Sequence, residues 1–227
     1  GFVQRAIGYA LTGDTREQCF FVCHGTGANG KSTLLEAVRY VLGDYGLTSA
    51  TDTFMRAKDG RGTENDVARL RGSRFVAAVE SGEERKLDEE RIKRLTGGDT
   101  IAARFLYREH FEFAPEFKIW MAVNDKPDIT GVDHGIWRRV RLIPFDVTIP
   151  AHEQDRELAT KLRAEAPGIL AWAVQGCLAW QNRGLRPPAA VTDATKDWRH
   201  EANAVARFVE EACDRGESVS VKSGSLL

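Results

Sequence analysis

The sequence predicts an α/β fold with a mainly parallel central sheet, an inserted β-hairpin and a C-terminal helical subdomain. Three observations support this fold class. Short apolar runs at residues 19–23, 74–80 and 117–123 are typical of strands buried in a parallel sheet. A glycine-rich turn follows the first run and leads into a helix with one apolar face. Beyond Pro150 the hydrophobic spacing is that of helices.

The other elements follow from apolar spacing and from residues typical of helix ends. Asp88 is a suitable N-cap, and Leu87 and Ile92 can form a hydrophobic staple. Gly97 and Gly98 stop that helix. Residues 44–73 are polar, with only a short helical signal. In chain order we expect a helix at 2–11, a strand at 19–23, a helix at 34–42, a short helix at 67–70, a strand at 74–80, a helix at 88–96, a hairpin at 100–113, strands at 117–123 and 139–145, and helices at 153–165, 167–182 and 192–214.

Composition and cysteine content restrict the class of protein. A hydrophobic content of 42% in 227 residues is enough for a core, which excludes wholesale disorder. Because 32 basic residues oppose 33 acidic ones, any nucleic-acid surface must be a local patch. The cysteines lack paired CxxC spacing and a histidine cluster, so we expect reduced thiols and no zinc site. They are Cys19, Cys23, Cys177 and Cys213.

No stretch of the sequence indicates a membrane or an export signal. No apolar run approaches the roughly 20 residues that span a bilayer, and no secretory signal is visible. We therefore expect a cytoplasmic protein without membrane contact. The chain begins without Met inside a helix-like stretch, so we also expect it to be part of a longer protein.

The glycine-rich turn, GTGANGKS, fits the phosphate-binding pattern G-x-x-x-x-G-K-[ST] at every fixed position. Glycines let backbone N–H groups curl around phosphates, Lys31 can reach the β and γ oxygens, and the Ser32 hydroxyl can ligate Mg²⁺. The strand before the turn and the helix after it are the context that this motif requires. The sequence therefore predicts a nucleotide site. Its candidate ATP-binding residues are Gly25, Thr26, Gly27, Ala28, Asn29, Gly30, Lys31, Ser32 and Thr33.

Two further polar residues end predicted strands. Glu80 could orient Mg²⁺ and accept a proton from the attacking water, although it could also be an ordinary exposed glutamate that starts a charged loop. Asn124 ends the strand at 117–123 and could hydrogen-bond the γ-phosphate or the water. Because the carboxyl ends of parallel strands meet at one edge of a sheet, we expect hydrolysis and not binding alone.

Several segments resemble the superfamily 3 helicases, and among them the helicase part of phage and plasmid primase-helicases. The resemblance rests on GTGANGKST, RFVAAVES, IKRLTGGDTIAARFLYREHFEFAPEFKIWMAVN and GIWRRVRLIPF, in this order and spacing. It implies an AAA+ type P-loop ATPase that forms a six-membered ring with ATP between neighbouring subunits. It also implies single-stranded or forked DNA as a partner, and an N-terminal primase-polymerase region in the parent chain.

The resemblance assigns a role to each candidate catalytic residue. Lys31, Ser32 and Thr33 belong to Walker A, Glu80 to Walker B, and Asn124 is the sensor. Arg139 falls where the arginine finger of a neighbouring subunit is expected, with Arg138 as a close rival. A solvated basic strand edge is the alternative for this WRRVR segment. Relatives often carry two acids at the end of the Walker B strand, whereas here Val79 and Ser81 flank Glu80. Whether Glu80 serves Mg²⁺, water or both stays open.

The hairpin tip, LYREH at 106–110, lies where this superfamily places a DNA-contacting loop in the channel of the ring. Arg108 and His110 can meet phosphates, Tyr107 can stack on a base, and Arg104 is nearby. The alternative is an exposed turn of mixed charge. The expected parts of the chain are thus a helical lead-in at 1–18, the ATPase core at 19–149, a helical subdomain at 150–216 and a linker at 217–227 toward a further domain.

Two other functions compete with the DNA helicase of phage or plasmid replication. A small-molecule P-loop kinase would need an acceptor pocket, and the charged segment at 56–74 could belong to a lid. A DNA-loading module would bind ATP without processive work. Stimulation of ATP turnover by single-stranded DNA separates the helicase from the kinase, and strand separation separates it from the loading module.

Overall fold

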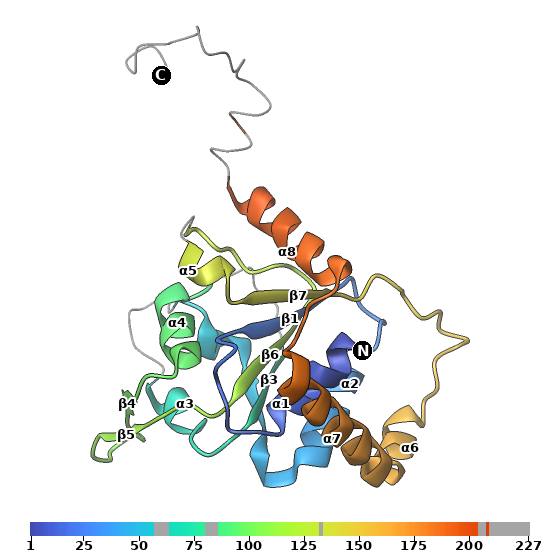
Figure 1. Ribbon diagram of the computed structural model, residues 1–227, viewed down its shortest axis with the longest axis horizontal. Helices are drawn as coiled ribbons and strands as arrows, with labels where there is room; N and C mark the ends of the chain where they lie inside the picture. Colours follow the sequence, from blue (N-terminus) through green and yellow to red (C-terminus); the bar gives the residue numbers. More distant parts are fainter. Residues whose placement is uncertain (57–63, 80–85, 132–133, 204–207, 209–227) are drawn as a thin grey trace, which may run out of the picture.

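The computed structural model describes residues 1–56, 64–79, 86–131, 134–203 and 208. Its centre is a sheet of five parallel strands in the order β2-β3-β6-β1-β7 (Figure 1). The strands are β1 (Phe20–His24), β2 (Gly46–Ala50), β3 (Phe75–Val79), β6 (Lys118–Val123) and β7 (Val140–Pro144). The mainly parallel α/β sheet predicted from the apolar runs is therefore confirmed.

Helices cover both faces of this sheet, which explains why its central strands are apolar throughout (Figure 1). α1 (Phe2–Ala10), α2 (Lys31–Leu42) and α7 (Ala166–Arg183) pack on one face. The other face is covered by η2 (Thr51–Phe54), α3 (Glu64–Ala68), α4 (Glu89–Gly97), α5 (His134–Trp137) and the Trp198 side of α8 (Ala189–Ala202). A short η1 (Gly43–Tyr45) follows α2, and α6 (Leu158–Ala164) precedes α7.

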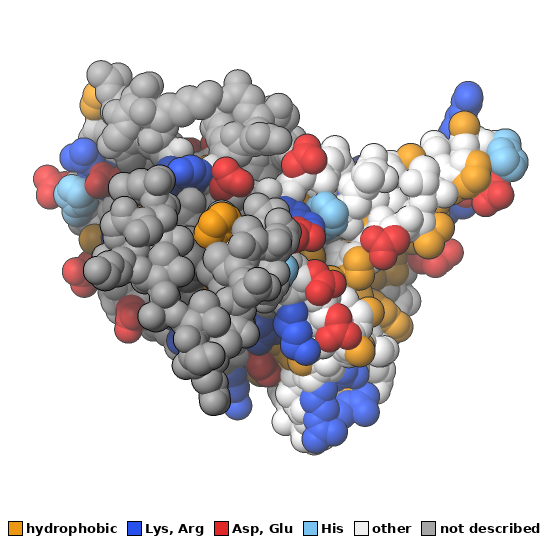
Figure 2. Space-filling model, turned by 90° about the horizontal axis from the view of Figure 1, so that it is seen from above, with side chains coloured by type: hydrophobic (Ala, Val, Ile, Leu, Met, Phe, Trp, Pro, Cys, Tyr) orange, Lys and Arg blue, Asp and Glu red, His pale blue; other side chains and the backbone are white. Residues whose placement is uncertain are grey.

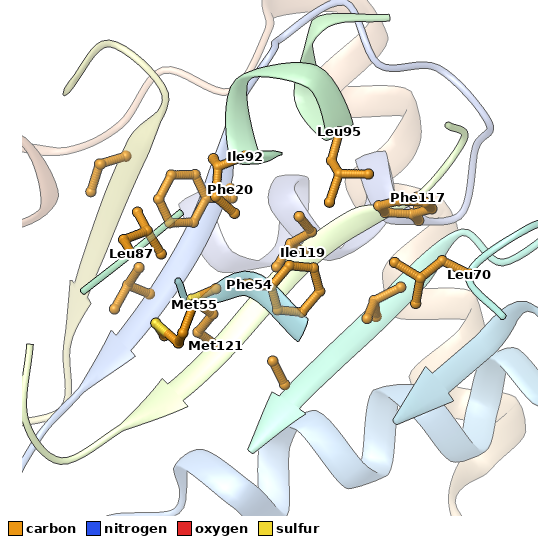
Figure 3. Packing of buried hydrophobic residues seen from close by; sticks show 14 of the residues in the cluster. Phe20, Phe54, Met55, Leu70, Leu87, Ile92, Leu95, Phe117, Ile119 and Met121 are labelled. Carbon is orange, nitrogen blue, oxygen red and sulfur yellow. The ribbon is translucent and has the colours of Figure 1, made fainter. Parts of the chain in front are cut away.

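Alternation along β1 divides its side chains between two hydrophobic clusters. Phe20 and Val22 join the α4 side, which Figure 3 shows around Phe54, Ile92 and Ile119. Phe21 joins the α1 side, where its ring stacks on Trp120 of β6 with centroids 4.2 Å apart. Burial of both alternating sets fixes the position of β1 between two layers of helices. The phosphate-binding motif directly follows this strand.

α1 and α7 cross at backbone contact, and two glycines make this possible. A Cβ on Gly8 would lie 2.1 Å from the Cys177 nitrogen, and a Cβ on Gly176 would lie 2.0 Å from the Gln4 oxygen. Beside the crossing, the Tyr9 and Trp180 rings pack with centroids 4.6 Å apart. The helix predicted at the start of the chain therefore belongs to the helical layer that packs, together with α2, on one face of the sheet.

Several predicted helix and hairpin features are confirmed. Asp88 caps α4, since its Oδ1 accepts a hydrogen bond from the Arg91 backbone N–H at 3.0 Å, and Gly98 ends it with φ +88°. β4 (Ile101–Ala103) and β5 (Phe111–Phe113) form the predicted antiparallel hairpin.

Two elements differ from the sequence prediction. β2 is an edge strand within a segment that we expected to be polar and largely irregular. Its Gly46–Ala50 sequence contains a single large apolar residue, Leu47, and pairs with β3 alone, so it lacks the signature of a buried strand. α6 covers Leu158–Ala164 and not 153–165, because residues 151–157 form turns with exposed side chains. The predicted helix at 192–214 begins at Ala189 and is described to Ala202.

The described surface carries mixed charges, and the described cysteines form no disulfide. On the described part of the face in Figure 2, acidic, basic and hydrophobic side chains are interspersed. Cys19, Cys23 and Cys177 are free, while Cys213 lies outside the described residues. Within the described ranges, no group of three metal-ligating His, Cys, Asp or Glu side chains occurs. No described helix combines the length and hydropathy needed to cross a bilayer.

Candidate functional site

The turn between β1 and α2 has the backbone of a phosphate cradle. Gly27 (φ +105°), Ala28 (φ +46°) and Gly30 (φ +83°) adopt positive φ. This conformation turns successive N–H groups toward one side and costs glycine little. At Gly25 the reason for glycine is space, since a Cβ there would lie 2.3 Å from the Phe145 oxygen. The motif residues thus have the local geometry that the sequence predicts.

Residues that follow β7 hold this turn in place. The Asn29 side-chain N–H donates to the Phe145 carbonyl at 2.9 Å, and the Ile149 N–H donates to the Ala28 carbonyl at 2.7 Å. Phe145 is itself bound to β1 through a 2.7 Å hydrogen bond to the His24 carbonyl. The segment that follows β7 therefore holds the turn through hydrogen bonds, which the motif alone does not predict.

Lys31 lies at the centre of the cradle. Its side chain is buried, and Nζ donates to Asn29 Oδ1 and to Asn124 Oδ1, both at 3.1 Å, and to the Gly25 carbonyl at 2.5 Å. These three oxygen acceptors hold the ammonium group between the loop and the end of β6. A buried cation at the N-terminus of α2 makes a site that suits an anion.

A cavity of about 340 Å³ opens over the cradle. Three chain segments far apart in sequence meet there, because β6 lies between β1 and β3 in the sheet. Ser32 is exposed to the cavity, and its hydroxyl is the kind of oxygen ligand that Mg²⁺ prefers. The lining residues are Gly27, Ala28, Asn29, Gly30, Lys31, Ser32, Thr33, Val79, Ala122 and Asn124.

Of the two predicted strand-end residues, Asn124 and Glu80, the structure describes only Asn124. Asn124 lines the cavity over the cradle and contacts Lys31, as the convergence of strand ends led us to expect. Glu80 lies outside the described residues. Its neighbour Val79, the last residue of β3, lines the cavity.

Sequence reasoning missed two features next to the cradle. His24, the last residue of β1, has its pKa lowered by burial and by the nearby Lys126 and Lys31, so its imidazole is neutral at pH 7. A second cavity, of about 260 Å³ and mostly apolar, lies between α2 and α6 and is bounded by Ser32 and Thr33. No motif marks it, because its walls come from segments more than a hundred residues apart. The other lining residues are Glu36, Ala37, Tyr40, Ala159, Leu162 and Arg163.

Arg138 and Arg139 lie at the amino end of β7, whereas the cradle follows the carboxyl end of β1, its parallel neighbour. Arg139 is buried, and it donates from Nε to Thr96 Oγ1 at 3.1 Å and from a terminal nitrogen to the Gly135 carbonyl at 2.6 Å. Arg138 is exposed and donates to Gln18 Oε1 at 2.8 Å. Neither arginine can therefore reach the cradle of its own chain.

The hairpin tip projects from the sheet with its side chains exposed. Tyr107 is 94% exposed and has φ +61°, an unusual conformation for a bulky side chain. Arg108 and His110 are also exposed. Arg104 is half exposed, and its Nε lies 3.0 Å from Glu64 Oε2 of α3. The four predicted DNA-contacting residues thus share one projection, and Arg104 has a protein partner there.

Known proteins similar to this chain include viral proteins named as helicases. The chain is 29% identical over 228 residues to "Putative helicase L207/L206" of Acanthamoeba polyphaga mimivirus. It is 31% identical over 231 residues to "Putative helicase 022R" of Frog virus 3. Each match covers 92% of this chain but only 24% of the viral protein. The chain therefore corresponds to about a quarter of each relative.

A solved structure shares the fold. The A-form apo structure of the NrS-1 C-terminal region matches with a TM-score of 0.61 at 14% sequence identity, over 95% of this chain and 55% of that one. The matched family covers residues 23–139, from the end of β1 to the start of β7, which is more than half of the sequence. The chain therefore belongs to the family described as "Family of unknown function (DUF5906)".

Proposed function

We propose that this chain is the motor domain of an ATP-dependent DNA helicase of superfamily 3, with an AAA+ type ATPase core. The observation that carries the proposal is the meeting of Lys31 Nζ with Asn124 Oδ1 at 3.1 Å in the cavity over the cradle. Lys31, which would bind phosphate, and Asn124, which follows β6, line the same cavity and would face the same nucleotide. The names of the viral relatives support the choice of a helicase.

ATP is the ligand that we assign to the two neighbouring cavities. Its phosphates lie in the cradle against the loop N–H groups and Lys31. Its base occupies the apolar cavity bounded by Thr33, Tyr40 and Leu162. Ser32 and Glu80 would hold Mg²⁺, which would supply positive charge against the phosphates of the nucleotide.

Hydrolysis requires a base and a group that orients water. We assign the base to Glu80, whose carboxylate can accept a proton from the attacking water. We assign the orienting role to Asn124, whose amide can donate to the γ-phosphate while its oxygen accepts from Lys31. The Lys31–Asn124 hydrogen bond couples the residue that binds phosphate to the residue that senses it.

An arginine from a neighbouring subunit completes the site. Since Arg138 and Arg139 lie at the amino ends of the strands and the cradle lies at their carboxyl ends, only a second copy can bring one to the γ-phosphate. The burial and internal hydrogen bonds of Arg139 favour Arg138 as this finger. The proposed assembly is a six-membered ring with the hairpins in its channel on single-stranded or forked DNA. In the parent protein, a primase-polymerase region supplies the primer-forming activity.

ATP turnover by the 227-residue chain, with and without single-stranded DNA, tests the proposal. We expect DNA to stimulate turnover, and Lys31→Ala to abolish it because no other described cation lies in the cradle cavity. Lys196→Ala on α8, whose lysine is 76% exposed, is the matched control and should behave as wild type. Turnover that DNA does not change would favour a small-molecule kinase. Stimulated turnover without strand separation would favour a DNA-loading module.

A further inference from the structure

The hairpin tip is held by one short element, α3, although forty residues separate them in sequence. Glu64 Oε2 pairs with Arg104 Nε at 3.0 Å, and Asn65 Oδ1 accepts a hydrogen bond from the Leu106 N–H at 3.2 Å. The two acceptors are consecutive residues, and they bind the two ends of the Arg104–Leu106 segment. They therefore fix both the position and the direction of the chain as it enters the tip.

The tip needs such support because its backbone is strained. The Arg108 N–H donates to the Phe105 carbonyl at 3.0 Å and closes a tight turn in which Tyr107 has φ +61°. A tyrosine in this conformation persists only when neighbouring contacts hold it. The Asn65 hydrogen bond acts on the residue directly before Tyr107.

The base of the hairpin also contacts the segment that follows α3. The Arg71 guanidinium, shortly after α3, lies 5.1 Å from the centroid of the Phe111 ring, and that ring stacks on Phe105 at 5.6 Å. The same segment of chain then runs into β3, whose last residue, Val79, lines the cavity over the cradle. α3 is thus the element that joins the hairpin tip to the strand beside the nucleotide site.

From this arrangement we infer that Glu64 and Asn65 are positioning residues for the hairpin tip. Asn65 holds the strained turn so that Tyr107 and Arg108 face outward, and Glu64 neutralises Arg104 and keeps its guanidinium off the DNA. Arg104 is then a structural residue of the tip and not a phosphate contact. This inference rests on the proposed function, since it assumes that the tip meets DNA.

The test is Glu64→Gln, measured by DNA titration at several salt concentrations and by DNA-stimulated ATP turnover. Releasing Arg104 should add a phosphate contact, so the salt dependence of affinity for single strands becomes steeper by about 0.7. Maximal stimulation should nevertheless fall about two- to fivefold, as loss of an exposed ion pair that orients the tip would give. Tighter binding with weaker stimulation is not expected from a residue that merely stabilises the fold. Turnover without DNA should not change.

Three further variants make the result decisive. Glu112→Gln removes the same charge from the exposed side of β5 without touching α3, and should neither steepen the salt dependence nor lower stimulation. The double variant Glu64→Arg, Arg104→Glu re-forms the pair and should restore stimulation. Asn65→Ala should lower stimulation with an unchanged salt dependence.

Three outcomes would overturn the inference in distinguishable ways. If Arg108→Ala loses stimulation while Glu64→Gln and Asn65→Ala keep it and keep the wild-type salt dependence, the inference alone is wrong. If Arg108→Ala also keeps full stimulation, the hairpin's role in the proposed function fails with it. A loss of stimulation that is explained by a lower melting temperature, and is not restored in the exchanged pair, would show a merely structural role.

Discussion

Asn124 directly follows β6, and Glu80 comes in sequence directly after the last residue of β3. Their variants should separate binding from chemistry. Glu80→Gln keeps the shape of the side chain but not its proton-accepting role, so it should bind ATP and turn it over very slowly. Asn124→Ala removes an acceptor of Lys31 and should lower turnover more than ATP affinity. Nucleotide binding and single-turnover hydrolysis measure the two effects. Normal turnover by Glu80→Gln would contradict the Walker B assignment.

Lys118 shows how a buried cation makes stability depend on pH. Its side chain is 1% exposed, and Nζ donates to the Thr12 carbonyl, to the Asp14 carbonyl at 3.2 Å and to the Glu116 carbonyl at 2.9 Å. These bonds tie the end of α1 to the start of β6. Burial is the main cause that lowers its pKa to about 7, with the Asp14 carboxylate opposing the shift.

The sign of the pH effect follows from this lowered pKa. Between pH 7 and about pH 10, the unfolded chain holds a proton on Lys118 that the folded chain has released, so stability rises with pH. Above about pH 8.5, the ordinary pKa of a thiol, Cys19 and Cys23 act in the opposite direction, because burial raises the pKa of each to about 12. The rise in the free energy of unfolding that Lys118 causes is therefore visible between pH 7 and about pH 8.5.

Lys118→Met should remove this rise in the free energy of unfolding, which is about 1 to 2 kcal/mol over that interval. It should also lower stability overall, since three carbonyls lose their donor. Urea unfolding at the two ends of the interval measures both effects, with Lys196→Met on the surface of α8 as the control. Equal pH dependence in wild type and Lys118→Met would disprove the assignment.

Residue types could be predicted from the sequence where a motif dictates them, and their environments could not. The cradle pattern requires Gly25, Lys31 and Ser32 at fixed spacing, so the turn was predictable. The burial of Arg139 depends on Thr96 in α4 and Gly135 in α5, which are remote in sequence. Alternation in the RRVR segment cannot tell which arginine faces inward, so the sequence left Arg138 and Arg139 as rivals.

At the scale of elements, the hairpin makes a prediction that distinguishes charge from stacking. Changing Arg108 and His110 to Ala should lower DNA stimulation and strand separation, and flatten the salt dependence by roughly 0.7 for each phosphate that the tip no longer binds. Tyr107→Ala should weaken DNA binding by roughly 1 to 3 kcal/mol per stacked base with almost no change in salt dependence. DNA titrations across salt concentrations, paired with an unwinding assay, measure both. Wild-type unwinding by the Arg108, His110 double variant would make the hairpin merely structural.

Elements were predictable in proportion to their burial. β1, β3 and β6 are enclosed by other strands and by helices, so their sequences are continuous apolar runs. β2 lies at the edge and alternates between half-buried and exposed residues, so its sequence resembles a loop. At the other edge, the Thr195 hydroxyl of α8 accepts a hydrogen bond from the Leu142 N–H of β7 at 3.0 Å. No local pattern predicts this cover, because it comes from a helix more than fifty residues later.

At the scale of the whole molecule, the distance across the sheet decides how the site is completed. β1 has five residues, and at a rise of about 3.3 Å per residue its first and last residues lie about 13 Å apart. Arg138 lies at the amino ends of β1 and β7, and the cradle lies at the carboxyl end of β1. If Arg138 or Arg139 takes part in hydrolysis, the active species must therefore contain at least two copies of the chain.

Mixing experiments test this requirement. Arg138→Ala should bind ATP and lose most of its turnover, because an arginine finger is worth roughly 10³ to 10⁵ in rate. Mixed with Lys31→Ala, it should recover activity at interfaces that pair an intact cradle with an intact arginine. Arg139→Ala should instead lower the melting temperature, since Thr96 and Gly135 lose their donor. Arg183→Ala, on the exposed end of α7, is the control. Turnover by a monomeric species, with no recovery in mixtures, would rule out an arginine supplied by a neighbour.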